Sequence, residues 1–297
     1  MKKLLVANRG EIAVRIMHAA AELGIRTVAV FSEDDARSLH TRRADEACPL
    51  HGVGVAAYLD VEQILAVAKA SGCDAVHPGY GFLSENAAFA RRAAAEGITF
   101  VGPHPETLEI FGDKTQARAL AERCGVPVLR GTADTVTVEQ AKNFLSSLGD
   151  GGAMMIKAVA GGGGRGMRVV RRPEEVDDAY ARCQSEALQA FGNGDVYVEQ
   201  LMARARHIEV QIIGDGSGSV SHLGERECSI QRRHQKLVEI APCPSLSSDL
   251  RASITADAVR MATINPARAG LVPGRGQGLV PAERADIASI TRAEGCA

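Results

Sequence analysis

The chain has 297 residues, of which 45% are hydrophobic and 24% charged, and its formal net charge is −2. This length suits one large domain or two to three smaller ones, and the balanced charge argues against binding to nucleic acid or to an acidic membrane surface. The seven cysteines are widely spaced and odd in number, which argues against a disulfide framework or a zinc knuckle and favours a reducing compartment. The apolar run Leu4–Ala7 is too short for a signal peptide, and no stretch approaches the roughly 18 apolar residues of a membrane span. We therefore expect a cytoplasmic protein.

The first hundred residues alternate short apolar runs with helical patterns. Strands are predicted at Lys3–Ala7, Thr27–Phe31, Ala75–His77 and Thr99–Val101, and helices at Glu11–Leu23, Val61–Ala70 and Asn86–Glu96. This alternation predicts an α/β domain, Rossmann-like, with a parallel sheet and helices on both of its faces. The turn Asn8–Glu11 after the first strand contains a single glycine, whereas a dinucleotide-binding turn needs three, so we do not expect a nicotinamide site.

A second block begins at Val126, after a helical stretch at Pro105–Gly125. We predict strands at Ala153–Val159, Met167–Arg171 and Asp195–Gln200, a hairpin of His207–Ile213 and Val220–Leu223 around Asp215-Gly216, and helices at Pro173–Phe191 and Ser248–Ala262.

The pattern changes after about Met261. The segment Thr263–Ala297 has no aromatic residue and is rich in Gly, Pro, Ala and Arg, so it lacks the apolar area to offset its ordering entropy and is expected to be a flexible tail.

The strongest local signal is a buried strand that ends in Lys157 and runs into a glycine-rich loop. The loop contains Gly161, Gly162, Gly163, Gly164 and Gly166. Glycines let backbone N–H groups approach phosphate oxygens, and the lysine adds a compact positive charge. No Gly-Lys-Ser/Thr opens a helix here, so this is not a P-loop. The alternative is a flexible hairpin loop, which four consecutive glycines disfavour because of their entropic cost.

Strand alternation places His207, Glu209 and Gln211 on one face. A His-x-Glu pair is typical of zinc deaminases, but those also need Pro-Cys-x-x-Cys, and Pro242-Cys243 has no second cysteine at that spacing. We therefore reject a zinc site. The polar face of an exposed strand is the alternative.

Two further segments are dense in polar groups. The run Glu225–Lys236 combines charged and amide side chains next to an apolar strand, which suits an anionic ligand; the alternative is a solvated loop. The run His77–Asn86 follows a predicted strand and opens a helix, and ligands bind at the carboxyl ends of parallel strands. A tight turn with Ser84 as the helix N-cap is the alternative there, and both interpretations can hold.

Together these segments resemble the biotin carboxylase family of the ATP-grasp superfamily. The motifs Val6–Ala13, His77–Asn86, Gly112–Lys114, Lys157–Gly166 and Glu225–Lys236 occur in the family's order and spacing, and the match runs from Met1 to about Ala262. The glycine-rich loop alone would indicate only an ATP-grasp protein. The resemblance implies a Rossmann-like pre-ATP-grasp domain over residues 1–112, an incomplete ATP-grasp domain over 113–262, and a non-matching tail over 263–297.

The resemblance implies an ATP-dependent ligase that uses bicarbonate to carboxylate biotin held on a biotin carboxyl carrier protein or domain. Bicarbonate would attack the γ-phosphate of ATP to give carboxyphosphate, whose breakdown delivers CO₂ to biotin. A carboxyltransferase component would be a further partner, and a homodimer is compatible with the full-length family member. Neither nucleic acid nor membrane is an expected partner.

The resemblance also implies site residues. The nucleotide phosphates would be held by Lys114, Lys157, Gly161, Gly162, Gly163, Gly164 and Gly166, the adenine or ribose by Glu199, Gln200 and Met202, and ribose and phosphate by His207, Gln231 and His234. Lys236 would neutralise bicarbonate, and Tyr80 would lie near the biotin ring. Lysines and backbone donors suit the spread negative charge of phosphoryl transfer.

The sequence departs from the family after about Met261. The family continues with carboxylates that bind Mg²⁺ and with a base for bicarbonate, and Thr263–Ala297 does not contain them. We therefore expect no metal ligands in this chain and little or no carboxylase activity from it alone. A reading-frame shift in a GC-rich gene would produce this composition, and natural truncation is the alternative. The competing functions are a non-catalytic ATP-binding or interaction fragment, and another ATP-grasp ligase of the carbamoyl phosphate synthetase type, which Gln231–Lys236 disfavours.

Overall fold

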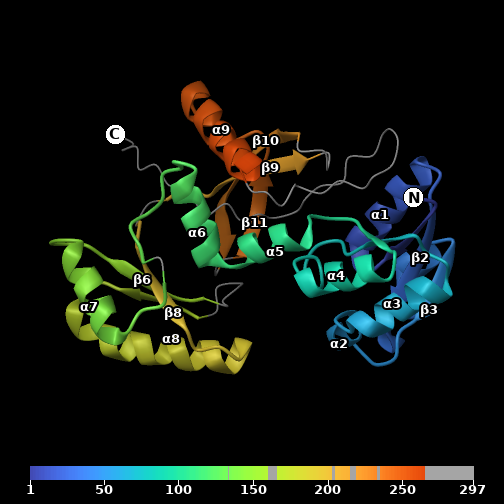
Figure 1. Ribbon diagram of the computed structural model, residues 1–297, viewed down its shortest axis with the longest axis horizontal. Coiled ribbons are helices and arrows are strands. Elements are labelled where there is room, and N and C mark those ends of the chain that lie inside the picture. The colour runs from blue at the N-terminus through green and yellow to red at the C-terminus, as the bar shows by residue number, and fades with distance from the viewer. Residues whose placement is uncertain (133, 160–165, 203–204, 215–218, 233–234, 265–297) are drawn as a thin grey trace. The chain divides into compact units, whose positions relative to one another are not determined.

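The computed structural model describes residues 1–132, 134–159, 166–202, 205–214, 219–232 and 235–264. The chain forms two compact units, one built mainly from Met1–Glu109 and the other mainly from Ile110–Gln211 and His222–Ile264 (Figure 1). Within the described ranges, no helix is both long enough and apolar enough to cross a membrane. The predicted loop Gly161–Gly164 and the turn Asp215-Gly216 lie outside the described residues.

The N-terminal unit contains a five-stranded sheet in the order β3-β2-β1-β4-β5, and all of its strand pairs are parallel. The strands are β1 (Lys3–Val6), β2 (Arg26–Phe31), β3 (Glu46–Pro49), β4 (Ala75–His77) and β5 (Thr99–Phe100). The helices are α1 (Gly10–Glu22), α2 (Val55–Tyr58), α3 (Val61–Ala70) and α4 (Ala87–Ala95), with short 3-10 turns at Glu33–Asp35 and Leu39–Arg42. The predicted parallel α/β domain is confirmed.

Alternation along β1 explains why helices cover both faces of this sheet. Leu5 points into the core that contains Ile64 of α3, whereas Leu4 points into the core that contains Ile16 of α1. Successive side chains of a strand face opposite ways, so an apolar run of this kind is stable only when both faces are covered. The parallel pairing of β1 and β4 places their carboxyl ends side by side.

The C-terminal unit contains two three-stranded sheets, in the orders β7-β6-β8 and β11-β10-β9. The strands are β6 (Met154–Ala158), β7 (Met167–Val170), β8 (Val196–Gln200), β9 (Ile208–Gly214), β10 (Val220–Arg232) and β11 (Gln235–Ile240). The remaining helices are α5 (Pro105–Gly112), α6 (Lys114–Arg123), α7 (Val138–Ser147), α8 (Val176–Phe191) and α9 (Ser248–Ile264). Both α7 and α8 pack on one face of the β7-β6-β8 sheet, where Leu145 and Cys183 meet Ile156. The architecture confirms the predicted Rossmann-like domain followed by a partial ATP-grasp fold.

Three local expectations differ from the structure in detail. The helical stretch Pro105–Gly125 is two helices, because Asp113 interrupts it and accepts a hydrogen bond from the backbone N–H of Gln116 at 3.1 Å. The helix α4 is capped by Asn86, whose side chain accepts from the N–H of Phe89 at 2.8 Å, and not by Ser84. The predicted helix Pro173–Phe191 opens with a 3-10 turn at Pro173–Glu175.

The fully buried side chain of His40 gives the N-terminal unit a pH dependence. Its Nε2 lies 3.1 Å from the carbonyl oxygen of Val30, and its Nδ1 has no hydrogen-bond partner in the described part of the chain. Burial lowers the pKa of His40, since a charged ring would be poorly solvated there. The folded state therefore holds this histidine neutral.

We expect the free energy of unfolding to fall as the pH drops below about 6.5, the ordinary pKa of histidine. In that range the unfolded chain binds a proton at His40 that the folded chain does not, until the pH reaches the lowered folded pKa. The loss between about pH 7.5 and about pH 5 should be smaller for His40→Gln than for the unchanged protein, measured by urea unfolding. The control is His18→Gln, because the His18 side chain is 77% exposed. An equal loss in all three proteins would contradict this account.

Candidate functional site

Hydrogen bonds connect the loop after β4 to the turn after β1. The side-chain amide of Asn8 donates to the carbonyl oxygens of Pro78, at 2.7 Å, and Tyr80, at 2.9 Å. Gly79 has a φ of +66°, and a Cβ at this position would lie 2.7 Å from Asn8 Nδ2, so only glycine fits. The hydroxyl of Tyr80 donates to the carboxylate of Glu11, and this bond lowers the pKa of Glu11. Tyr80 is 42% exposed, so a polar aromatic ring stands at the carboxyl ends of the parallel strands.

The predicted phosphate-binding lysine, Lys157, lies on the face of the β7-β6-β8 sheet opposite to α7 and α8. Its Nζ is 2.5 Å from Glu199 Oε2 on the neighbouring strand β8. Alternation puts these side chains on one face, since the preceding residue on each strand, Ile156 on β6 and Val198 on β8, points into the helix-covered core. Burial, followed by the charge of Glu199, raises the pKa of Tyr197 next to them. The lysine is thus charge-compensated without a ligand.

Other predicted nucleotide residues surround this strand pair. The backbone N–H of Gln200 donates to the carbonyl of Arg130 at 2.7 Å, and half-buried Met202 follows the end of β8. Gly166 has a φ of +65°, and a Cβ there would come within 2.7 Å of the Ala158 side chain. Lys114 begins α6, but its side chain lies outside the described part of the structure, as do Gly161–Gly164 and His234.

The β11-β10-β9 sheet carries a second polar cluster, centred on Glu209. This carboxylate, whose side chain is 9% exposed, accepts from Lys236 of β11, from Arg226 of β10 at 2.9 Å and from His207 at 3.1 Å. Arg226 also donates to Gln211 at 2.9 Å. The prediction that His207, Glu209 and Gln211 share one face is therefore confirmed.

The charges around Glu209 determine its ionisation. Burial alone would raise the pKa of this carboxyl, but hydrogen bonds from His207 and Lys236, together with the charge of Lys236, outweigh burial and lower it. Gln231 Nε2 lies 2.8 Å from His207 Nδ1. An amide nitrogen can only donate, so Nδ1 accepts and Nε2–H faces Glu209. The cluster holds an imidazole, an amide and a compensated lysine next to one another.

The structure thus brings three predicted residues together, namely His207, Gln231 and Lys236, and separately pairs Lys157 with Glu199. Sequence reasoning missed Glu209 and Arg226 as members of the cluster. The His-x-Glu alternation did put Glu209 on the right face, but nothing local indicated that its partners come from two other strands. In the ranges that the structure describes, no group of three His, Cys, Asp or Glu side chains could hold a metal ion.

Removing the charge of Glu209 should destabilise the protein. In Glu209→Gln, Lys236 and Arg226 lose their shared carboxylate in a poorly solvated place, and we expect a loss of about 3–5 kcal/mol in the free energy of unfolding. The matched control is Glu239→Gln, since Glu239 also pairs with Arg226 but is 38% exposed; its loss should stay below about 1 kcal/mol. Urea unfolding measures both, and equal losses would show that the cluster has no special role in stability.

Family models match nearly the whole chain. Residues 1–108 match the biotin carboxylase N-terminal domain, and residues 113–271 match the ATP-binding domain of the carbamoyl-phosphate synthase L chain. The first match covers the parallel sheet with the Asn8–Tyr80 contact. The second covers both polar clusters of the C-terminal unit.

Known proteins similar to this chain are longer than it. Pyruvate carboxylase of Bacillus subtilis is 53% identical over 277 residues, which are 92% of this chain and 24% of that protein. Biotin carboxylase of Campylobacter jejuni, solved with β-γ-ATP, is 41% identical with a TM-score of 0.86, over 88% of this chain and 59% of that one. The biotin carboxylase domain dimer of Hydrogenobacter thermophilus 2-oxoglutarate carboxylase, solved with MgADP, ADP and bicarbonate, is 45% identical with a TM-score of 0.83, over 88% and 58%.

The chain therefore spans about a quarter of the pyruvate carboxylase that it matches and under two thirds of the solved biotin carboxylase chains. The matched part includes every polar cluster described above. On the strength of the two domain matches and of the fold, the chain belongs to the biotin carboxylase family of ATP-dependent ligases.

Proposed function

We propose that this chain binds ATP in its C-terminal unit and serves the ATP- and bicarbonate-dependent carboxylation of biotin. The observation that carries the proposal is the cluster of His207, Gln231 and Lys236 around Glu209, a set of anion-binding side chains kept in place by one carboxylate. Similar chains were solved with β-γ-ATP, and with MgADP and bicarbonate, which supports the same ligands here. The match of residues 1–108 favours a biotin carboxylase over a carbamoyl phosphate synthetase.

Each polar group has a proposed role in this reaction. Lys157 would leave its ion pair with Glu199 and bind the nucleotide phosphates. Lys114 and the backbone N–H groups of Gly161–Gly164 and Gly166 would bind the same phosphates. The adenine and ribose would lie against Glu199, Gln200 and Met202. Phosphoryl transfer requires positioning and charge stabilisation more than covalent help from the protein, and lysines with backbone donors supply both.

The Glu209 cluster would act on the other end of the nucleotide and on bicarbonate. His207, Gln231 and His234 would hold ribose and phosphate. Lys236 would leave its ion pair with Glu209 and pair with bicarbonate, an anion with the same planar pair of oxygens as a carboxylate. Tyr80, with its hydroxyl anchored by Glu11, would contact the biotin ring.

Biotin would arrive on a carrier protein or domain, and a carboxyltransferase would use the carboxylated product. Magnesium, when bound, neutralises charge on the phosphates. The described residues include no group of three His, Cys, Asp or Glu side chains arranged as metal ligands, so they do not by themselves fit this ion. The sequence after about Met261, which lacks the carboxylates of the family pattern, favours a second candidate function for the 297 residues alone, a non-catalytic ATP-binding module. A cytoplasmic location remains a prediction from the cysteine pattern.

The role of Lys157 can be tested by calorimetry with a nonhydrolysable ATP analogue. Lys157→Met removes the charge opposite the phosphates, and we expect the affinity to fall by roughly tenfold or more, as for the loss of one charged hydrogen bond. Lys142→Met is the control, because Lys142 is a partly exposed lysine of α7 paired with Asp177. Unchanged affinity in Lys157→Met would exclude the proposed phosphate contact.

We also expect the 297 residues alone to carboxylate biotin slowly or not at all. The assay is bicarbonate-dependent ADP release with free biotin, run beside a version whose residues after Met261 are replaced by the family pattern. Loss of a catalytic base commonly costs roughly 10²–10⁴-fold, and missing metal ligands add to that. Comparable turnover by the two proteins would show that Thr263–Ala297 has been misinterpreted.

A further inference from the structure

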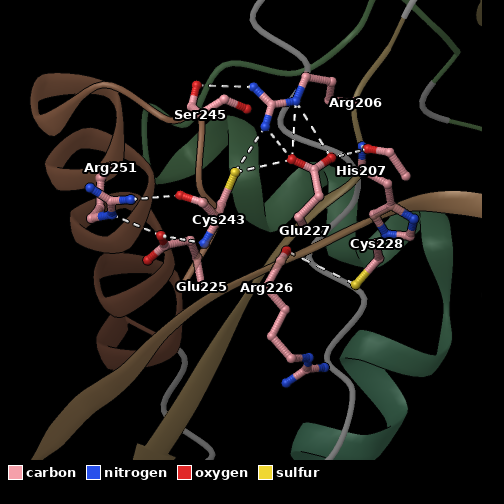
Figure 2. A network of polar contacts seen from close by, with 10 residues as sticks. Arg206, His207, Glu225, Arg226, Glu227, Cys228, Cys243, Ser245 and Arg251 are labelled. Atoms are coloured by element: carbon pink, nitrogen blue, oxygen red, sulfur yellow. Dashed lines mark hydrogen bonds and ion pairs between the residues drawn. The ribbon is translucent and has the colours of Figure 1, made fainter. Parts of the chain in front are cut away.

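Two buried carboxylates on β10 have no part in the function proposed above. Glu225 and Glu227 are 3% and 8% exposed, and each is paired with an arginine (Figure 2). Arg251 of α9 donates to Glu225 with an Nε–Oε1 distance of 2.7 Å, and Arg206 donates to Glu227 with an Nε–Oε2 distance of 3.1 Å. Carboxylates are rarely buried without such partners, so the pairs fix the surrounding chain.

Cys243 lies between the two carboxylates, as Figure 2 shows. Its backbone N–H donates to Glu225 at 3.2 Å, and its thiol donates to Glu227 at 3.0 Å. Burial, and then the bond to Glu227, raise the pKa of Cys243, so the group stays a thiol and a donor. Arg251 also donates a hydrogen bond to the carbonyl oxygen of Cys243, at 2.9 Å. These hydrogen bonds connect the segment after β11, which contains Cys243, to Glu225 and Glu227 of β10.

The hydrogen bonds of Glu227, unlike those of Glu225, extend to the segment that carries His207. Its second oxygen accepts from the hydroxyl of Ser229, and that hydroxyl accepts from the backbone N–H of His207 at 2.8 Å. Arg206, the residue before His207, is held by the same carboxylate. The His207 carbonyl in turn accepts from the N–H of Cys228 at 2.7 Å. Glu227 therefore acts on the N-terminal side of the His207 Cα, through Ser229 and Arg206, while the backbone N–H of Cys228 holds the carbonyl side.

We propose that Glu227 is a positioning residue that, through Ser229 and Arg206, sets the place of His207 for nucleotide binding. The inference rests on the proposed function, because it assumes that His207 contacts the nucleotide. Glu209 and Gln231 orient the His207 ring, whereas Glu227 and Ser229 locate the backbone that carries it. A contact that depends on hydrogen-bond geometry is lost when the side chain moves by about an ångström, so both constraints are needed.

The test measures binding of a nonhydrolysable ATP analogue to the 297-residue chain by calorimetry. Glu227→Gln removes the charge, and Ser229→Ala cuts only the link to His207, so the milder variant decides the question if the first one does not fold. Both should weaken binding by about tenfold. The control is Glu225→Gln, a carboxylate of the same strand and similar burial, which should leave the affinity within about twofold. Equal weakening by the control would overturn the inference in favour of a general structural role.

The same substitutions are then made in His207→Ala. If Glu227 acts through His207, neither Glu227→Gln nor Ser229→Ala weakens binding further in that background. A further tenfold loss there would overturn the inference while leaving the nucleotide contact of His207 intact. Wild-type affinity in His207→Ala alone would instead remove the proposed nucleotide contact of His207, and the positioning role with it.

Discussion

The carboxylate of Glu209 is the constraint on which the polar face of the C-terminal unit depends. A nearly buried carboxylate is stable only when its charge is matched, and its bonds here come from Lys236, Arg226 and His207. The first two partners lie on β11 and β10, so one negative charge requires three strands to sit side by side in one register. The side chains that would bind nucleotide and bicarbonate are thereby gathered before any ligand is present.

Other carboxylates in this unit also compensate the charge of a neighbouring cation. Glu199 compensates Lys157 on the β7-β6-β8 sheet, and Glu227 compensates Arg206, which lowers the pKa of Glu227 to about 2. A cation that already has a carboxylate partner need not be stripped of water when an anion arrives, because it exchanges one set of oxygens for another. Charge compensation would therefore link stability in the free protein to the proposed recognition of phosphate and bicarbonate.

The sequence was sufficient for features that depend on local pattern. Alternation between apolar strands and amphipathic helices predicted the parallel sheet of the N-terminal unit, and the Lys157 strand lies where it was expected. Features set by distant partners were not predictable. Nothing near Glu209 indicates that Arg226 and Lys236 would reach it, and β10 continues through a bulge to Arg232, where a solvated loop was the alternative. Asp113 divides a stretch that was predicted to be one helix, and Asn86 caps α4 in place of Ser84.

We propose that Glu209 holds a preformed anion site for nucleotide and bicarbonate. The decisive measurement is a crystal structure of this chain with an ATP analogue and bicarbonate. We expect Glu209 to keep its bond to Arg226 while Lys236 turns toward the bound anion, with nucleotide oxygens beside His207 and Gln231. Nucleotide bound away from these side chains, with the Glu209 contacts unchanged, would contradict it.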